Sequence, residues 1–398
     1  MMHTVRRMLQ RPLLGCRPLR ACAVLLSLAL LPAGPVGVVA EAPPSGFQAT
    51  MRDLFQALTA VFPVPLHAEQ WQDPAQYPRM LAALRALAHH AEGLMMPGQA
   101  VPQHLDFLRY ALAREAHQAL HWYEHRQYQA VQVAVLHLTE HCFACHTKLP
   151  PPQRFALGQR FLAEAPLASL SLPERARLAV ATRQFDTALE LYETLFQSSA
   201  IAAEDLGLMG AFEDYLKIGL RVQHDVRRVV RTLETFRQRP DVPPSLTAYL
   251  GSWVDALHAL QSVAAPEDAL PYARTLIREG QGRNRFPADR LGLVHFVAAS
   301  GLLHRSVDSS PVPGPSLAEA YYLLGVAESH ISRTLWLSET EFFLETAMHL
   351  APRSEHARQA YACLEAHVLA RYPGSAGLHL PAEVRAHLAE LRRLLDGS

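Results

Sequence analysis

Residues 138–146 read Leu138-Thr139-Glu140-His141-Cys142-Phe143-Ala144-Cys145-His146, at the end of an apolar repeat that is typical of a helix. The last five residues match Cys-x-x-Cys-His, the attachment signature for a c-type haem. Positions three apart lie on one face of a helix, so Cys142 and Cys145 can both bond to the vinyl groups of one haem. His146 would then reach the iron from the proximal side. The stretch therefore predicts one covalent haem c on a helix.

The first 40 residues have the three parts of a secretory signal peptide. Residues 1–20 carry five arginines and no acidic residue, an apolar run follows at 21–31, and Val38-Val39-Ala40 supplies a small-residue cleavage site. We expect export across the inner membrane of a bacterium and a periplasmic mature protein. The alternative is an uncleaved anchor, which would need a longer apolar run. The mature chain is expected to have no transmembrane segment.

Removal of residues 1–40 also removes two of the five cysteines and leaves Cys142, Cys145 and Cys363. A redox-active disulfide between the motif cysteines is one alternative to haem. A zinc site is another, but no second Cys or His pair follows at zinc-site spacing. Cys363 lies in an apolar helical pattern and is expected to pack as a small hydrophobic residue.

The charge balance of the mature chain excludes one class of partner. The full sequence has 37 basic and 37 acidic residues, and the segment before Glu41 holds five bases and no acid, so 32 bases and 37 acids remain. This net charge of −5 and the lack of a basic cluster predict no binding to nucleic acid.

Apolar residues that recur every three or four positions predict that the fold class is all-α. In the first part of the mature chain they predict helices at about 47–62, 78–95, 103–125 and 127–148, separated by short breaks. Four amphipathic helices with short connections form an antiparallel bundle, which we place at residues 41–152.

A four-helix bundle with Cys-x-x-Cys-His near the end of its last helix resembles the cytochrome c′ family and its low-spin relatives, over about residues 45–150. The resemblance implies a monohaem domain in which His146 is the proximal iron ligand. In the low-spin members a methionine of the first helix supplies the sixth ligand, and Met51 stands at that place here. In cytochrome c′ itself an apolar residue takes this position and the iron stays five-coordinate.

The sixth ligand remains open at this stage. Met51 lies on the apolar stripe of the first helix and either ligates the iron or packs in the core. Histidines at positions 89, 90 and 141 are alternative ligands.

Other histidines repeat every four residues along two predicted helices. They are either a second metal site or a polar flank of the bundle; the residues concerned are His117, His121, His125, His137 and His141.

Residues 153–398 predict a helical array that is similar to tetratricopeptide repeats. In one place a large, a small and an aromatic residue follow one another at steps of three and four, a pattern that locks helix pairs in such repeats. In a second place a Leu-Gly start is followed, after a longer turn, by an Ala-x4-Pro end. These residues are Phe185, Ala188 and Tyr192 in the first place, and Leu324, Gly325, Phe343, Ala347 and Pro352 in the second. The alternative is a generic helical array without defined repeats.

Together these features predict an exported monohaem cytochrome that carries electrons and docks on a redox partner, or on another envelope protein, through the helical array. One alternative is a five-coordinate haem module that binds NO or CO. Another is an assembly or scaffold protein of the tetratricopeptide type with an accessory haem. The sequence shows no catalytic constellation apart from the haem motif, so we do not expect an enzyme.

Overall fold

The computed structural model describes the chain from residue 46 onward. The described ranges are 46–61, 71–94, 106–148, 170–208, 210–262, 268–286, 289–309, 314–331, 339–370, 372–374, 377–378 and 380–396. The predicted signal peptide lies outside them, as does the predicted boundary between bundle and array near residue 152. Residues 44–398 cluster as one unit.

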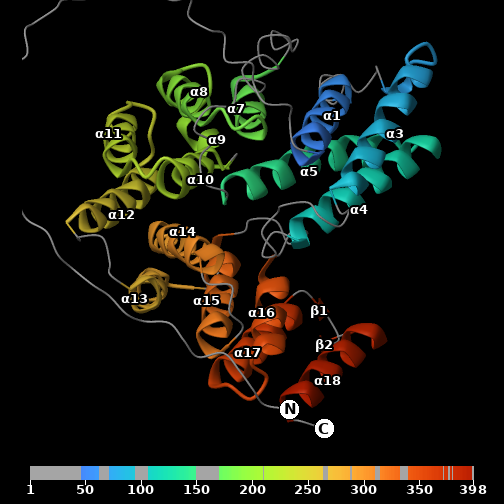
Figure 1. Cartoon of the computed structure of the whole chain (residues 1–398). Coiled ribbons are helices and arrows are strands. Elements are labelled where there is room, and N and C mark those ends of the chain that lie inside the picture. Colours follow the sequence, from blue (N-terminus) through green and yellow to red (C-terminus); the bar gives the residue numbers. More distant parts are fainter. Residues whose placement is uncertain are drawn as a thin grey trace, which may run out of the picture. The chain divides into compact units, whose positions relative to one another are not determined.

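The described chain is almost entirely helical, which confirms the predicted fold class (Figure 1). The strands within the described ranges are two short ones that pair antiparallel, β1 (Pro373–Gly374) and β2 (Gly377–Leu378). In the same ranges, no helix is both long enough and apolar enough to cross a membrane.

The described residues of the predicted bundle region include four helices that correspond to the four predicted ones. They are α1 (Gly46–Val61), α3 (Tyr77–Gly93), α4 (Asp106–Glu124) and α5 (Tyr128–His146). The turn between α4 and α5 places Arg126 at a φ of 58°, and the Gln127 amide donates to the Trp122 carbonyl at 2.8 Å. This short turn brings α5 back onto α4.

These helices pack mainly in chain order. Helix α1 packs on α3, α3 on α4, and α4 on α5, and the next large interface of α5 is with α7 (Leu172–Ala181). A closed bundle would instead bring its last helix back onto its first. The described packing thus supports an all-helical region and leaves the four-helix bundle a prediction.

The array region consists of helices that also pack on their chain neighbours, with α15 on both α14 and α16 (Figure 1). Its elements after α7 are α8 (Phe185–Gln197), α9 (Ala203–Leu208), α10 (Ala211–Lys217), the π-helical segment η3 (Ile218–Val222), α11 (Val226–Phe236), α12 (Pro244–Gln261), α13 (Ala269–Arg283), α14 (Leu293–Ser309), α15 (Pro315–Ile331), α16 (Glu339–Leu350), α17 (Glu355–Leu369) and α18 (Ala382–Asp396).

The residues that suggested repeats lie in the contacts between helices. Phe185, Ala188 and Tyr192 are buried in α8, which packs on α7. On α15, a Cβ added at Gly325 would lie 2.6 Å from the Leu344 side chain of α16, so only glycine permits this close approach. These contacts explain the pattern without establishing a tetratricopeptide repeat.

Two hydrophobic cores divide the described chain. The N-terminal core contains apolar residues of α1, α3, α4 and α5 together with Leu178 and Ala181 of α7. The array core runs from α7 to α18 and also includes Phe143 of α5. Helices α5 and α7 therefore contribute to both cores, and the haem motif lies where the cores meet.

Candidate haem site

Helix α5 carries the whole Cys-x-x-Cys-His motif in its last turns, and His146 is its final residue. Both motif cysteines are free thiols that are partly buried. Burial raises the pKa of Cys142 to about 12 and that of Cys145 to about 11. Cysteines that exchange disulfides or bind metal have a lowered thiol pKa instead. The raised pKa of both thiols therefore does not indicate a redox disulfide or a zinc site, and covalent attachment to a haem remains a prediction.

The position of His146 suits a proximal iron ligand. Its side chain is buried, and its Nδ1 lies 3.1 Å from the Val180 carbonyl oxygen of α7. A carbonyl only accepts, so Nδ1 carries the proton and the lone pair of the neutral ring is on Nε2. Burial, followed by the charge of Arg183, lowers the pKa of His146 to about 4, which keeps the ring neutral. Metal-bound histidines commonly donate their second ring nitrogen in this way.

The turn between α7 and α8 supports this geometry. Arg183 has a φ of 58°, and its amide donates to the same Val180 carbonyl at 2.8 Å. The acceptor of His146 is therefore fixed by a backbone turn of the array. The charges of Arg183 and Arg109 also act on Cys145, and each lowers the pKa of a thiol that burial raises.

The last turn of α5 is anchored beyond the motif. The Lys148 amide donates to the Cys145 carbonyl at 3.1 Å, and the buried Thr147 hydroxyl donates to the Phe143 carbonyl at 2.9 Å. Phe143 itself is buried in the array core, with the Lys217 ammonium 5.5 Å from the centre of its ring. The helix end that carries the motif is therefore embedded in the array.

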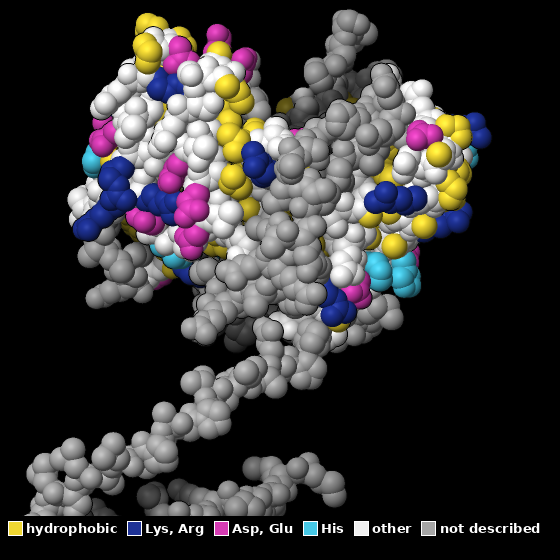
Figure 2. Space-filling model, turned by 90° about the horizontal axis from the view of Figure 1, so that it is seen from above, with side chains coloured by type: hydrophobic (Ala, Val, Ile, Leu, Met, Phe, Trp, Pro, Cys, Tyr) yellow, Lys and Arg dark blue, Asp and Glu magenta, His cyan; other side chains and the backbone are white. Residues whose placement is uncertain are grey.

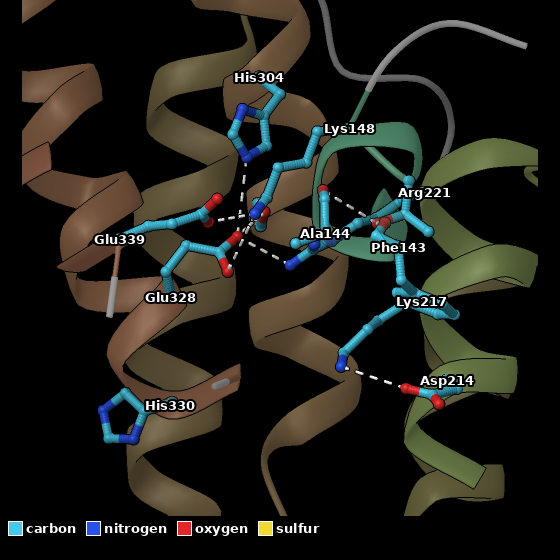
Figure 3. A network of polar contacts seen from close by, with 12 residues as sticks. Phe143, Ala144, Lys148, Asp214, Lys217, Arg221, His304, Glu328, His330 and Glu339 are labelled. Atoms are coloured by element: carbon cyan, nitrogen blue, oxygen red, sulfur yellow. Dashed lines mark hydrogen bonds and ion pairs between the residues drawn. The ribbon is translucent and has the colours of Figure 1, made fainter. Parts of the chain in front are cut away.

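A cluster of buried charges follows directly (Figure 3). We call Lys148, Arg221, Glu328 and Glu339 the charge cluster. The Lys148 ammonium pairs with Glu339 and lies 3.9 Å from Glu328, while Arg221 donates to Glu328 at 2.8 Å. All four side chains are at most 6% exposed. Arg221 comes from η3, where a π-helical turn changes the direction of the side chains.

Two residues of α14 complete the surroundings of the charge cluster. The Ser300 hydroxyl donates to Glu328 at 2.6 Å, and His304 Nε2 lies 3.7 Å from the same carboxylate. Burial alone would raise the pKa of Glu328, but Arg221 and Lys148 hold it well below its usual range. Burial raises the pKa of Glu339, and Lys148 offsets this only in part.

Met51 lies on α1 and packs, partly buried, against the N-terminal core. The main packing partner of α1 is α3, whereas the Val180 carbonyl of α7 holds His146. The described contacts thus account for Met51 as a core residue, and its role as sixth ligand remains a prediction.

The other histidines are distributed among separate contacts. His117 Nε2 lies 2.7 Å from Glu92, and His137 Nδ1 lies 3.3 Å from Glu115. His141 is buried, and burial lowers its pKa to about 4. Within the ranges that the structure describes, no three His, Cys, Asp or Glu side chains gather into a metal site. Both readings of these histidines remain predictions, and the burial of His141 does not match a polar flank.

Sequence reasoning missed the charge cluster. One signal was present, because only Lys148 and Lys217 are lysines after residue 40, and Lys148 stands two residues beyond the motif. Its partners carried no signal, since Glu328 and Glu339 belong to helices about two hundred residues further along the chain.

The surface is consistent with the charge balance of the sequence. On the face drawn in Figure 2, the described acidic and basic side chains are interspersed rather than gathered into one patch.

Comparisons of this chain with protein-family models, with curated proteins and with solved structures gave no match.

Proposed function

We propose that this protein is an exported monohaem c-type cytochrome that carries electrons. The observation that carries the proposal is His146, which ends the Cys-x-x-Cys-His helix as a buried, neutral imidazole whose Nδ1 donates to the Val180 carbonyl at 3.1 Å. This tautomer leaves Nε2 as the ligand atom. The thiols of Cys142 and Cys145 are the attachment points.

A haem held at these residues would supply a reversible one-electron couple. The chain contributes the covalent tether, the axial imidazole and the burial of the ligand, which are the features that set the potential and the orientation of such a group. The residues around the motif thus have binding and tuning roles.

The helical array supplies the docking function in this proposal. Packed helix pairs commonly present a surface to a partner protein, and the partner here would be a redox protein of the cell envelope. This argument rests on architecture and is an analogy. The predicted signal peptide at residues 1–40 supports a periplasmic location, where c-type haem is attached.

A five-coordinate haem that binds NO or CO is the second candidate, in which Met51 packs in the core and does not ligate the iron. The described contacts of Met51 are with the N-terminal core, on a helix that packs on α3. Without a methionine ligand the ferrous iron would have an open position. A high-spin spectrum that shifts on addition of CO would support this candidate, and a low-spin spectrum that does not respond would exclude it.

The test of the main proposal is covalent haem content. The full-length protein, expressed with its own N-terminus in a host that attaches c-type haem, should give one haem per chain in a pyridine haemochrome assay. The Cys142→Ala/Cys145→Ala variant should lose covalent haem entirely. Cys363→Ala is the matched control, because this partly buried thiol lies on α17 and is expected to leave the haem content unchanged. Equal haem in all three proteins would overturn the proposal.

A further inference from the structure

The charge cluster lies one helical turn beyond the second haem-attachment cysteine. The Lys148 amide donates to the Cys145 carbonyl oxygen at 3.1 Å, so Lys148 lies in the turn that directly follows α5. The charge of Lys148 is also the largest of the charges that act on the Cys145 thiol, and Glu339 is the next. Two buried opposite charges therefore lie close to the place where the haem would be attached.

Stability gives no sufficient reason for this arrangement. Taking charges out of water is costly, and apolar residues of similar volume often replace a buried ion pair without loss of stability. Glu339 is imperfectly satisfied as well, because its Oε1 is buried with no hydrogen-bond partner in the described structure. An expensive, incompletely paired cluster beside a reactive site indicates a role in the chemistry.

Electrostatics gives the cluster such a role. A buried charge acts on its neighbours more strongly than a solvated one, since little water screens it. Reduction of a haem iron from Fe(III) to Fe(II) adds one electron and lowers the positive charge at the iron. A nearby ammonium therefore favours the reduced state, and a nearby carboxylate favours the oxidised state.

We propose that the charge cluster tunes the reduction potential of the haem, with Lys148 raising the potential and Glu339 lowering it. The inference rests on the proposed function, since it requires the haem at Cys142 and Cys145. The electron comes from a one-electron donor protein, and no bond is made or broken in the transfer. Arg221, Glu328 and His304 face the same pair and fix the background charge against which it acts.

The test compares midpoint potentials of the full-length holoprotein at about pH 8, well above the ordinary carboxylate pKa of about 4.3, because burial raises the pKa of Glu339. Glu339→Gln removes one negative charge and leaves Lys148 and Arg221 with Glu328 as their one carboxylate in the cluster, so the cluster becomes net positive. The midpoint potential of this variant should rise by at least about 59 mV, which is a tenfold change in the equilibrium constant of a one-electron couple. Lys148→Met/Glu339→Gln removes both charges. Its redox equilibrium constant should lie within about threefold of that of the unchanged protein.

Glu345→Gln is the matched control, since this carboxylate lies on the same helix, is 30% exposed and pairs with His387. Its potential should stay unchanged because water screens the charge. A purely structural role would shift the single and double variants in the same direction, with a larger shift in the double variant. That pattern, or no shift in Glu339→Gln, would overturn the inference. Should Glu339→Gln not fold, Glu339→Leu makes the same charge change with an apolar side chain and must give the same sign.

These outcomes separate the inference from the function on which it rests. Covalent haem in all the variants, with potentials that ignore the charge changes, would refute the tuning role and leave the cytochrome proposal intact. A full-length protein without covalent haem would refute both.

Discussion

The N-terminal core and the array core differ in how they handle charge. Around the N-terminal core, Arg85 and Glu124 form an ion pair between α3 and α4 whose side chains are 60% and 38% exposed. In the array, Lys148, Arg221, Glu328 and Glu339 are buried together. The same interaction is thus a solvated contact in one region and a desolvated cluster in the other. Helix α5 is part of the N-terminal core, but Lys148, which follows its last residue, forms its ion pairs with carboxylates of the array.

Replacement of Lys148 should give the largest loss of stability among the variants that compare the two regions. Lys148→Ala leaves Glu328 and Glu339 buried with one cation fewer, and removal of one partner from a buried pair costs about 3–5 kcal/mol. We expect the free energy of unfolding to fall by about that amount in a denaturant titration. Arg85→Ala in the exposed pair should cost at most about 1 kcal/mol. Equal losses in the two variants would show that the two regions do not differ in this respect.

Acid should weaken both regions through buried histidines. Burial lowers the pKa of His141 in α5, and of His295 in α14, to about 4. The unfolded chain takes up these protons near its ordinary pKa of about 6.5, whereas the folded chain resists them, so stability falls as the pH drops from about 6.5 to 4. The slope is about 1.4 kcal/mol per pH unit for each histidine.

Denaturant titrations across this pH range measure that slope. His141→Gln and His295→Gln should each reduce this slope by about 1.4 kcal/mol per pH unit, the contribution of one histidine. His117→Gln replaces an exposed histidine and is the control for the substitution itself. A slope that neither buried-site variant alters would contradict the assignment.

Glycine substitutions should compare the tightness of helix packing in the two regions. A Cβ at Gly325 in α15 would lie 2.6 Å from Leu344, and overpacking of this kind costs about 1–3 kcal/mol. A Cβ at Gly93, at the end of α3, would lie 3.2 Å from the Thr50 methyl group, which is a less severe approach. We expect Gly325→Ala to lower the midpoint of thermal unfolding clearly and Gly93→Ala to change it little.

Gly282 provides the control for both glycines, because nothing lies within 4 Å of a Cβ placed there. Gly282→Ala should be neutral, or stabilising by at most about 1 kcal/mol from helix propensity. A loss in Gly282→Ala as large as that in Gly325→Ala would mean that close packing is not the cause.

Much of the helical framework could be predicted from periodicity alone. The predicted helix at 127–148 corresponds to α5 (Tyr128–His146), and the interval 103–125 corresponds to α4 (Asp106–Glu124). The apolar stripes also predicted buried positions such as Leu138, Tyr192 and Ala347. These predictions succeed because the apolar residues that form a helix and mark its buried face recur locally, with a period of 3.6 residues.

The way in which the helices come together was less predictable. The sequence suggested that α5 closes a bundle, but after α4 its largest interface is with α7. A stripe of apolar residues indicates that a helix face is buried and does not indicate which helix covers it. The loop lengths gave no further help, because the segment between α5 and α7 is long enough to permit either arrangement.

The sequence by itself determined the motif, the helix that carries it and the identities of Cys142, Cys145 and His146, because a covalent attachment signature is a local pattern. Only the tertiary structure decided which carbonyl receives the His146 proton and which carboxylate pairs with Lys148. Val180 is 34 residues from His146, and Glu339 is 191 residues from Lys148. Such pairs form when helices that are distant in the sequence pack around a common core. A polar group buried in that core destabilises the fold unless it has a partner.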